Sequence, residues 1–268
     1  MTVPLAKPRR SVLYMPASNA KAVDKARTLA CDAVILDLED AVPADAKDAA
    51  RGALAIGFTH KPVIVRINGV GTPWHAADLA ALGTLRPAAV MLPKAEDVAS
   101  VLAIARYGAV VALIETAKGV ANARALAGSG AVCRLAFGSI DLAADLGCEH
   151  GREALAYARG EFVLASNLGR LPPPLDGVTT DIADGERVAD DARHARRLGF
   201  GGKLIVHPAQ VGAVLGAFRP SAEQAAWARR VLASGDGAGA VDGSMVDEPV
   251  RKQARSILQR CDAAGEHP

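Results

Sequence analysis

Short apolar runs recur along most of the chain, and they constrain its fold more than any other feature. Eight of them can be counted: Ser11–Pro16, Ala33–Glu39, Pro62–Asn68, Ala89–Lys94, Val110–Thr116, Arg134–Ser139, Leu175–Thr180 and Lys203–His207. They are rich in Val, Ile and Leu, and they do not alternate apolar with polar residues. That pattern is typical of strands that are buried on both faces of a parallel sheet.

Stretches with helical composition separate most of these runs. The clearest examples are Ala20–Ala30, Asp45–Gly57, Trp74–Leu85, Glu96–Arg106 and Glu186–Leu198. Eight strand–helix units over about 200 residues predict an α/β fold, the (β/α)8 or TIM barrel. A doubly wound open sheet is the alternative, but the first run leads into Ala17-Ser18-Asn19 and not into a Gly-rich dinucleotide loop.

The chain continues beyond the eighth run with a segment of different character. Ser221–Ala233 predicts a helix with Ser221 as its N-cap, and Val250 to about Cys261 predicts a last helix. Between them, Gly235–Gly243 holds four glycines, which we interpret as a hinge. We therefore expect a catalytic barrel over residues 1–219 and a C-terminal helical arm over residues 220–268. Such a segment is typical of a lid or of an arm exchanged between subunits; a tail helix packed on its own barrel is the alternative.

Composition excludes several classes of partner. The net charge is only +2, and no basic block is present, so we expect no nucleic acid. No apolar run approaches the ~20 residues of a membrane helix. The first ten residues lack the apolar region of a signal peptide. The four cysteines (Cys31, Cys133, Cys148 and Cys261) share no metal-ligand spacing and are interpreted as buried thiols. The cytoplasm is the expected compartment.

Polar side chains gather where the predicted strands end. They are Ser18 and Asn19 after the first strand, then Asp37, Glu39, Asp40, Arg66, Asn68, Lys94, Glu115, Ser139, Asp141, Asp181 and His207. The carboxyl ends of the strands form the face of a barrel on which active sites are built. Polar residues at all eight ends favour a functional site at this rim.

Two of these residues form a candidate metal pair. Glu115 closes one apolar run, and Asp141 follows Gly138 just beyond the next. Neighbouring parallel strands lie about 4.8 Å apart, so both carboxylates can reach one ion. With no His or Cys beside them, they suit a hard cation, and Mg²⁺ fits best. The alternative is a surface Glu and a helix N-cap Asp.

The order of motifs resembles the citrate lyase β-subunit (CitE-like) group of the HpcH/HpaI aldolase and malyl-CoA lyase superfamily. The motifs are Arg10–Pro16, Asp37–Val42, Val65–Asn68, Met91–Glu96, Ile114–Gly119, Phe137-Gly138 with Asp141-Leu142, and Ile205–Gln210. The resemblance covers nearly the whole chain, with about one motif per strand. It implies a TIM barrel, a Mg²⁺ ion and a homo-oligomer, commonly a trimer.

The resemblance also implies roles for single residues. In that family the residues equivalent to Glu115 and Asp141 hold the metal, and the residue equivalent to Arg66 binds the carboxylate of a 2-oxo acid. Asp247 matches an aspartate that comes from a neighbouring subunit and acts as an acid or base. The implied reaction is the reversible cleavage of a 3-hydroxyacyl thioester, similar to citryl-CoA or malyl-CoA, into an acyl thioester and a 2-oxo acid.

Other residues at the rim are then assigned by chemistry. The planar fork of Arg66 matches a carboxylate, with a structural salt bridge as the alternative. Glu39 and Asp40 are predicted to bind metal-bound waters or to position Arg66, and solvent-side charge or a helix cap is the alternative. The free N–H groups of Gly138, Ser139 and Ile140 at the start of a helix form a candidate anion site.

The thioester carrier is left open between CoA and an acyl carrier protein. His207 is a candidate neighbour of the thioester arm, although a lone His is more often structural. Lys21, Lys25 and Lys94 are candidates, by position alone, for contacts to carrier phosphates. Two other functions stay open: a metal-dependent aldolase for free 2-oxo acids, and a non-catalytic binding subunit.

Overall fold

The computed structural model describes residues 9–265 of the chain. By their internal contacts these residues fall into two compact units, divided between Leu215 and Gly216. The larger unit carries the predicted rim, and the smaller unit carries Asp247.

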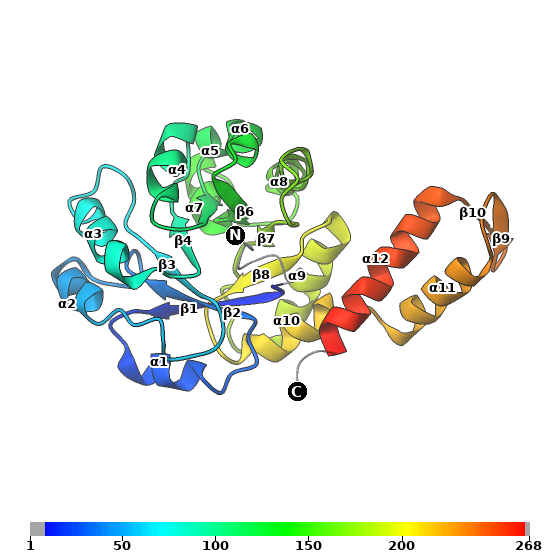
Figure 1. Ribbon diagram of the computed structural model, residues 1–268, viewed down its shortest axis with the longest axis horizontal. Helices are drawn as coiled ribbons and strands as arrows, with labels where there is room; N and C mark the ends of the chain where they lie inside the picture. Colours follow the sequence, from blue (N-terminus) through cyan, green and yellow to red (C-terminus); the bar gives the residue numbers. More distant parts are fainter. Residues whose placement is uncertain (1–8, 266–268) are drawn as a thin grey trace. The chain divides into compact units, whose positions relative to one another are not determined.

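The larger unit is a closed barrel of eight parallel strands, which confirms the predicted (β/α)8 fold (Figure 1). The strands are β1 (Ser11–Pro16), β2 (Ala33–Asp37), β3 (Val63–Arg66), β4 (Ala89–Leu92), β5 (Val110–Ile114), β6 (Val132–Phe137), β7 (Leu175–Asp176) and β8 (Gly202–Ile205). They pair in chain order, and β1 closes the barrel by pairing with β8. β7 is shorter than the predicted Leu175–Thr180, because only Leu175 and Asp176 join the ladder.

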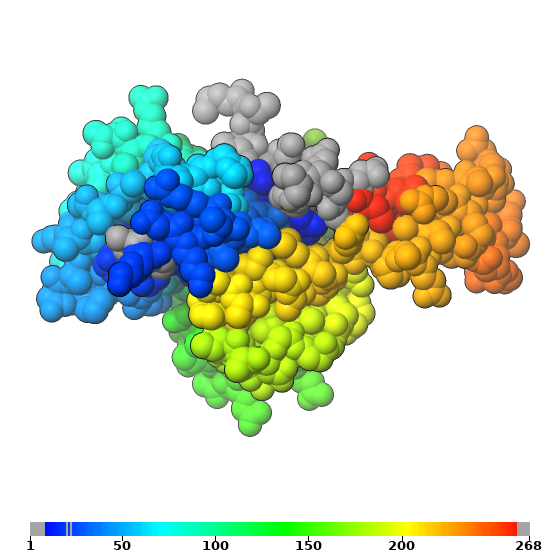
Figure 2. All heavy atoms as spheres, turned by 90° about the horizontal axis from the view of Figure 1, so that it is seen from below, coloured from blue at the N-terminus to red at the C-terminus, as the bar shows by residue number. Residues whose placement is uncertain are grey.

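Helices cover the outside of the barrel. They are α1 (Ala20–Ala26), η1 (Ala44–Ala46), α2 (Lys47–Gly52), α3 (His75–Leu85), α4 (Val98–Ala105), α5 (Ala117–Ala121), α6 (Ala123–Gly128), α7 (Ser139–Leu146), α8 (Ala156–Leu168), α9 (Gly185–Leu198) and α10 (Gln210–Phe218). α1 and α2, in blue, lie on the same face as α9 and α10, in yellow-green and yellow, as closure between β1 and β8 requires (Figure 2). Within residues 9–265, no helix combines the length and the apolar character that a membrane span needs.

Alternate strand residues fill the inside of the barrel. Val12, Ile35, Ile64, Met91 and Leu113 belong to one buried cluster to which every strand contributes. Because the remaining strand side chains pack against the helices, both faces of the sheet are buried, and this explains the apolar runs without alternation. The strands therefore form a rigid frame whose carboxyl ends position the rim residues.

The smaller unit is built from two helices and a hairpin. They are α11 (Ala222–Ala233), β9 (Gly239–Val241), β10 (Ser244–Val246) and α12 (Glu248–Gly265). Ser221 caps α11 as predicted, in a capping box with Gln224. Apolar residues of both helices and of β10 form a core of their own: Ala228, Val231, Val246, Ala254 and Ile257.

The prediction of a flexible hinge over Gly235–Gly243 is wrong in its second half. β9 and β10 pair antiparallel, and the two residues between them have positive φ, 53° at Asp242 and 77° at Gly243. Asp-Gly is the preferred sequence for such a two-residue turn, because both positions need a left-handed backbone. Only the first part of the glycine-rich stretch, before Gly239, lies outside regular structure.

Candidate active site

The carboxyl ends of β2 and β3 place Arg66 among three acidic residues. Asp37 and Arg66 are partners in the strand register. Arg66 donates from Nε to Asp37 Oδ1 at 2.7 Å and from Nη2 to Asp37 Oδ2 at 2.6 Å. Its Nη1 lies 2.9 Å from Glu39 Oε2, as an ion pair without hydrogen-bond alignment, and 3.4 Å from Asp40 Oδ2. Glu39 and Asp40 therefore contact Arg66, in agreement with their predicted positioning role.

The sequence interpretation placed Asp37 at the rim but gave it no role. Asp37 accepts both N–H groups on one edge of the guanidinium and also the backbone N–H groups of Glu39, at 2.9 Å, and Ala41, at 3.1 Å. The predicted bidentate fork is thus already occupied along Nε and Nη2, and the remaining nitrogen, Nη1, faces Glu39 and Asp40. The signal for Asp37 was its position at the last residue of β2, opposite an Arg at the end of β3.

Tyr14 holds the other face of Arg66. The guanidinium carbon lies 4.8 Å from the ring centroid, and the Tyr14 hydroxyl donates to Met91 Sδ at 3.2 Å. Burial raises the pKa of Tyr14, so the ring stays neutral and favours a cation above it. Asn68, another predicted rim residue, is turned away, because its backbone and side-chain N–H groups donate to Asp78 of α3.

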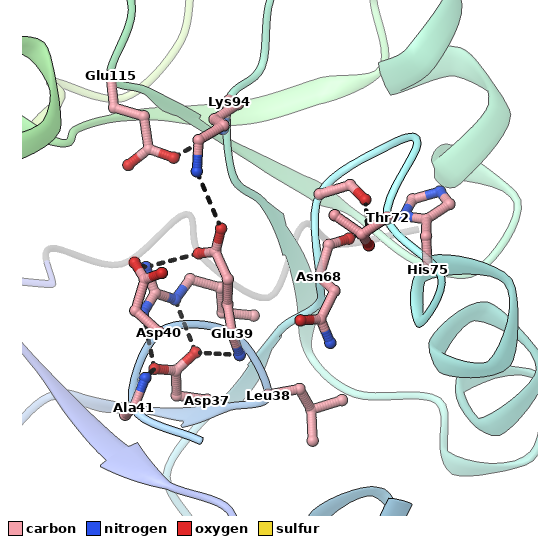
Figure 3. Close-up of polar contacts among 12 residues, drawn as sticks. Asp37, Leu38, Glu39, Asp40, Ala41, Asn68, Thr72, His75, Lys94 and Glu115 are labelled. Carbon is pink, nitrogen blue, oxygen red and sulfur yellow. Dashed lines mark hydrogen bonds and ion pairs between the residues drawn. The ribbon is translucent and has the colours of Figure 1, made fainter. Parts of the chain in front are cut away.

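Lys94 connects this acidic group to the predicted metal ligand. Its backbone N–H donates to Glu115 Oε1 at 2.8 Å, and its Nζ lies 3.4 Å from Glu39 Oε1 (Figure 3). Lys94 also has a positive φ of 47°, a backbone conformation that residues other than Gly rarely adopt. The close-up shows Glu115 and Glu39 on opposite sides of the Lys94 side chain.

The surroundings of Glu115 suit a hard cation. Glu115 is 2% exposed, and burial, with the nearby Glu39 and Asp141 carboxylates, raises its pKa to about 8. Burial likewise raises the pKa of Glu39 to about 6. A divalent ion would offset this clustering of negative charge. Within residues 9–265, no group of three or more His, Cys, Asp or Glu side chains is placed to hold a metal ion. An ion at Glu115 and Asp141 would therefore be bound by these two carboxylates together with oxygen atoms of water and ligand.

Gly138 makes room for this arrangement. Its N–H donates to Ile114 O, and a Cβ at position 138 would lie 2.4 Å from both Cβ and Oε2 of Glu115. Any larger residue would displace Glu115. The glycine at the end of β6 therefore fits the carboxylate pair, and Asp141, half-buried in the first turn of α7, follows three residues later.

The predicted anion site lies at the start of α7, but one of its three predicted donors is wrong, because the Gly138 N–H donates to Ile114 O at 2.9 Å and is not free for a ligand. Gly138 is the N-cap, and no side chain caps the helix, so the N–H groups of Ser139, Ile140 and Asp141 lack helical acceptors. Ser139 is buried, and its Oγ lies 2.9 Å from His150 Nε2. The Ile140 side chain is 42% exposed. The backbone of this turn, and not the Ser139 hydroxyl, is the part that offers donors to a ligand.

His207 has a local role in the structure. The exposed ring accepts the Ala209 N–H at Nδ1, at 3.2 Å. The buried Gln210 organises this region: its Oε1 accepts the N–H groups of Val206 and His207, and its Nε2 donates to the carbonyls of Thr179 and Asp181. Gln210 thus ties together the loops that follow β7 and β8. A contact between His207 and a thioester stays a prediction.

Asp247 lies in the smaller unit, at the start of α12. Its Oδ1 accepts the Val250 N–H at 3.2 Å, and its carbonyl accepts the Arg251 N–H at 3.0 Å. This is the geometry of a helix cap. The acid or base role of Asp247 therefore stays a prediction that the described geometry does not require.

Comparison with known proteins identifies the class to which this barrel and rim belong. Residues 10–208 match the family described as HpcH/HpaI aldolase/citrate lyase, and the chain belongs to this family. It is 41% identical over 264 residues to a citrate lyase subunit beta-like protein of Mycobacterium tuberculosis, covering 94% of this chain and 95% of that protein. It is 35% identical over 275 residues to a (3S)-malyl-CoA thioesterase of Cereibacter sphaeroides, covering 96% of each.

A solved structure resembles the chain over nearly its full length. The CitE protein of Mycobacterium tuberculosis, in complex with magnesium, acetoacetate and coenzyme A, superposes with a TM-score of 0.87 at 39% identity. The match covers 96% of this chain and 99% of that one. The resemblance to the citrate lyase β-subunit group is thus confirmed.

Proposed function

We propose that this protein is a Mg²⁺-dependent carbon–carbon lyase that cleaves a 3-hydroxyacyl thioester into an acyl thioester and a 2-oxo acid, or condenses the two. The observation that carries this proposal is the buried Glu115 carboxylate beside Asp141 and Lys94, at the rim that also holds Arg66. Family membership, and a similar protein whose structure holds magnesium, a 3-oxo acid and coenzyme A, support the same chemistry.

Glu115 and Asp141 would hold the metal. When bound there, Mg²⁺ supplies Lewis-acid stabilisation of the negative charge that develops on the substrate hydroxyl oxygen. Lys94 fixes the Glu115 carboxylate through its backbone N–H, and Gly138 provides the space in which that carboxylate sits.

We expect the carboxylate of the 2-oxo acid to bind at Nη1 of Arg66, in exchange for one of the contacts that Nη1 makes with Glu39 and Asp40. Asp37 holds the other edge of the guanidinium by two hydrogen bonds, so the orientation of Nη1 is set before the substrate arrives. The N–H groups at the start of α7 add donors for the same negative charge. A charged hydrogen bond from a preorganised donor is typically stronger than a neutral one.

Two protons must move for the reaction to balance. The substrate hydroxyl loses a proton as the carbon–carbon bond breaks, and the bond electrons remain on the thioester fragment as an enolate. The enolate carbon then gains a proton and becomes the acyl thioester. We assign both transfers to the Asp247 carboxylate, which accepts the hydroxyl proton and returns a proton to the enolate carbon. Asp247 would be delivered by the arm of a neighbouring subunit, so we expect a homo-oligomer, with a trimer favoured. Its role as a helix cap is compatible with this, because only Oδ1 is engaged by the helix.

The nature of the products decides between this reaction and its alternatives. With malyl-CoA and citramalyl-CoA as substrates, a lyase forms an acyl-CoA and a 2-oxo acid, whereas a thioesterase forms free CoA and a hydroxy acid. An aldolase for free 2-oxo acids would need no thioester, and a binding subunit would form no product. Chromatographic measurement of these products, with Mg²⁺ and with a chelator, tests the proposal. Release of free CoA without a 2-oxo acid would contradict it. Repeating the assay with an acyl carrier protein thioester identifies the carrier.

A further inference from the structure

A second cavity lies at the amino ends of the strands, away from the rim. Its volume is about 1000 Å³, and the loops that lead from α3, α4, α6 and α8 into β4, β5, β6 and β7 enclose it. These helices follow one another around the barrel wall (Figure 1). The lining is largely apolar and includes Ala88, Ala105, Tyr107, Val132, Leu171 and Pro172. A cavity of this size is in the range that binds small molecules.

Three arginines line this cavity. Arg86 caps the C-terminus of α3, Arg106 caps that of α4, and Arg170 follows the C-terminus of α8. Each is exposed, and none has a carboxylate partner among residues 9–265. The four loops, residues 83–88, 105–109, 129–133 and 169–174, contain no Asp or Glu. The cavity therefore has a positive lining without an acidic residue in it.

The backbone at two of these arginines is unusual. Arg86 has φ 48° and Arg170 has φ 55°, a left-handed conformation in which helix ends usually have glycine. The equivalent loop before β6 has Gly130 with φ 75°. A cation near a helix C-terminus is favourable by itself, so capping is the structural alternative. The barrel topology brings these helix ends together, and the observation that goes beyond capping is the apolar cavity that the three arginines share.

A fourth arginine, Arg134, is next in sequence to Cys133, which lines the cavity. Arg134 is buried, and it donates to the carbonyls of Pro173, at 2.8 Å, and Arg9, at 3.2 Å, rather than to a carboxylate. Burial lowers its pKa to about 10, so it remains charged at neutral pH. Arg134 is thus a further cation in the segment that forms this part of the cavity wall.

We propose that this cavity binds an organic anion with an apolar body, such as an alkyl carboxylate or an alkyl phosphate. The arginines provide the charge complement for the anionic group, and the apolar lining takes the alkyl part. The site is distinct from the metal and thioester site at the opposite ends of the strands. It does not depend on the reaction proposed above.

Calorimetric titration with four probes tests the proposal: octanoate, octyl phosphate, 1-octanol and inorganic phosphate. We expect octanoate or octyl phosphate to bind at about one equivalent, and 1-octanol and inorganic phosphate to bind at least tenfold more weakly. Whichever of the two anions binds more tightly identifies the anionic group. Absence of measurable binding for both would overturn the proposal.

Variants separate a binding site from three helix caps. The triple variant Arg86→Gln, Arg106→Gln, Arg170→Gln should weaken anion binding at least tenfold, and Ala131→Phe should do so by filling the cavity with all three arginines kept. The matched control removes three exposed arginines elsewhere, Arg187→Gln, Arg197→Gln and Arg229→Gln, and should bind as the wild type does.

Two results with these variants would overturn the proposed anion site. Equal loss in the control triple would show non-specific attraction to net charge and would overturn the site. Unchanged binding in both cavity variants would do the same. Glu115→Gln should leave octanoate affinity unchanged, so a failure of the rim assignment and a failure of this cavity can be told apart.

Discussion

At the carboxyl end of the barrel, Asp37, Glu39 and Asp40 surround Arg66, whereas at the amino end Arg86, Arg106 and Arg170 have no carboxylate beside them among the described residues. At the first end the side chains contact one another, and burial raises the pKa of the Glu115 carboxyl to about 8, so that its charged form needs a cation beside it. At the second end the cations are exposed around an apolar cavity. We therefore propose a site for a cation at one end of the barrel and a site for an anion at the other.

The two ends of the barrel differ most at the proposed metal ligands, Glu115 and Asp141. We expect substitutions there to have the largest effect on ligand binding. Glu115→Gln or Asp141→Asn should abolish Mg²⁺-dependent binding of a 2-oxo acid, because each removes one of two carboxylates from the donor set. Calorimetry with Mg²⁺ and oxaloacetate measures this directly, and circular dichroism checks that the fold is intact. Normal Mg²⁺ and oxaloacetate binding in both variants would disprove the metal assignment.

Asp247 tests whether the smaller unit completes the rim. If it transfers a proton, Asp247→Asn should retain substrate binding and reduce kcat by a factor on the order of 10²–10⁴. If it only caps α12, the variant should lose about 1 kcal/mol of stability and keep its turnover. Measurement of kcat, KM and thermal unfolding on the same sample separates the two roles.

A mixing experiment then asks which subunit supplies Asp247. Asp247→Asn and Glu115→Gln chains are unfolded and refolded together, so that hetero-oligomers form. If the arm crosses between subunits, some sites receive an intact barrel and an intact arm, and activity returns. A verified hetero-oligomer without activity would mean that each arm serves its own barrel.

Arg66 tests how far the rim depends on its fixed geometry. Arg66→Lys should lower kcat/KM on the order of 10²-fold, because a point charge cannot keep both hydrogen bonds to Asp37 and still present a directed donor. Arg124→Lys is a matched control, since Arg124 makes a similar bidentate pair with Glu161 on the outer helices. Unchanged kcat/KM in Arg66→Lys would remove the substrate role.

The barrel and most of its rim could be predicted because periodicity reports local structure. Eight apolar runs identified the strands, and polar residues after them identified the functional face. The role of Asp37 was missed because it depends on the register that sets Asp37 opposite Arg66, which no local pattern encodes. Gln210 was missed for the same reason, since its acceptors come from the loop after β7.

In the smaller unit the error came from a local pattern that was misinterpreted. Four glycines in Gly235–Gly243 predicted flexibility, but glycine also permits the positive φ that a tight hairpin needs. The Asp242-Gly243 pair carried the turn signal and was read as part of a hinge. Whether the arm serves its own barrel or a neighbouring subunit stays a prediction, because no local pattern of the chain encodes contacts between subunits.

The smallest expected effect concerns the raised pKa of Glu115 and is measured as the change of protein stability with pH. The pKa of Glu115 is raised to about 8 in the folded protein, against a usual value of 4.5, mainly because burial disfavours the charged form. The unfolded chain thus loses its proton at lower pH, and metal-free stability should fall as pH rises from about 4.5 to 8. Thermal unfolding at a series of pH values should show a decline of several degrees across this window.

Glu115→Gln provides the control for this decline, because an amide of similar shape does not ionise. The variant should lose less stability over the same window and should be the more stable protein near pH 8 without metal. Saturating Mg²⁺ should flatten the wild-type curve, since an ion bound to the carboxylate stabilises its charged form, and should leave the variant unchanged. If the stability curves of the wild type and Glu115→Gln run parallel, both with and without Mg²⁺, the charged form of Glu115 is already stabilised by Lys94. The rim would then lack the uncompensated carboxylate on which the metal assignment rests.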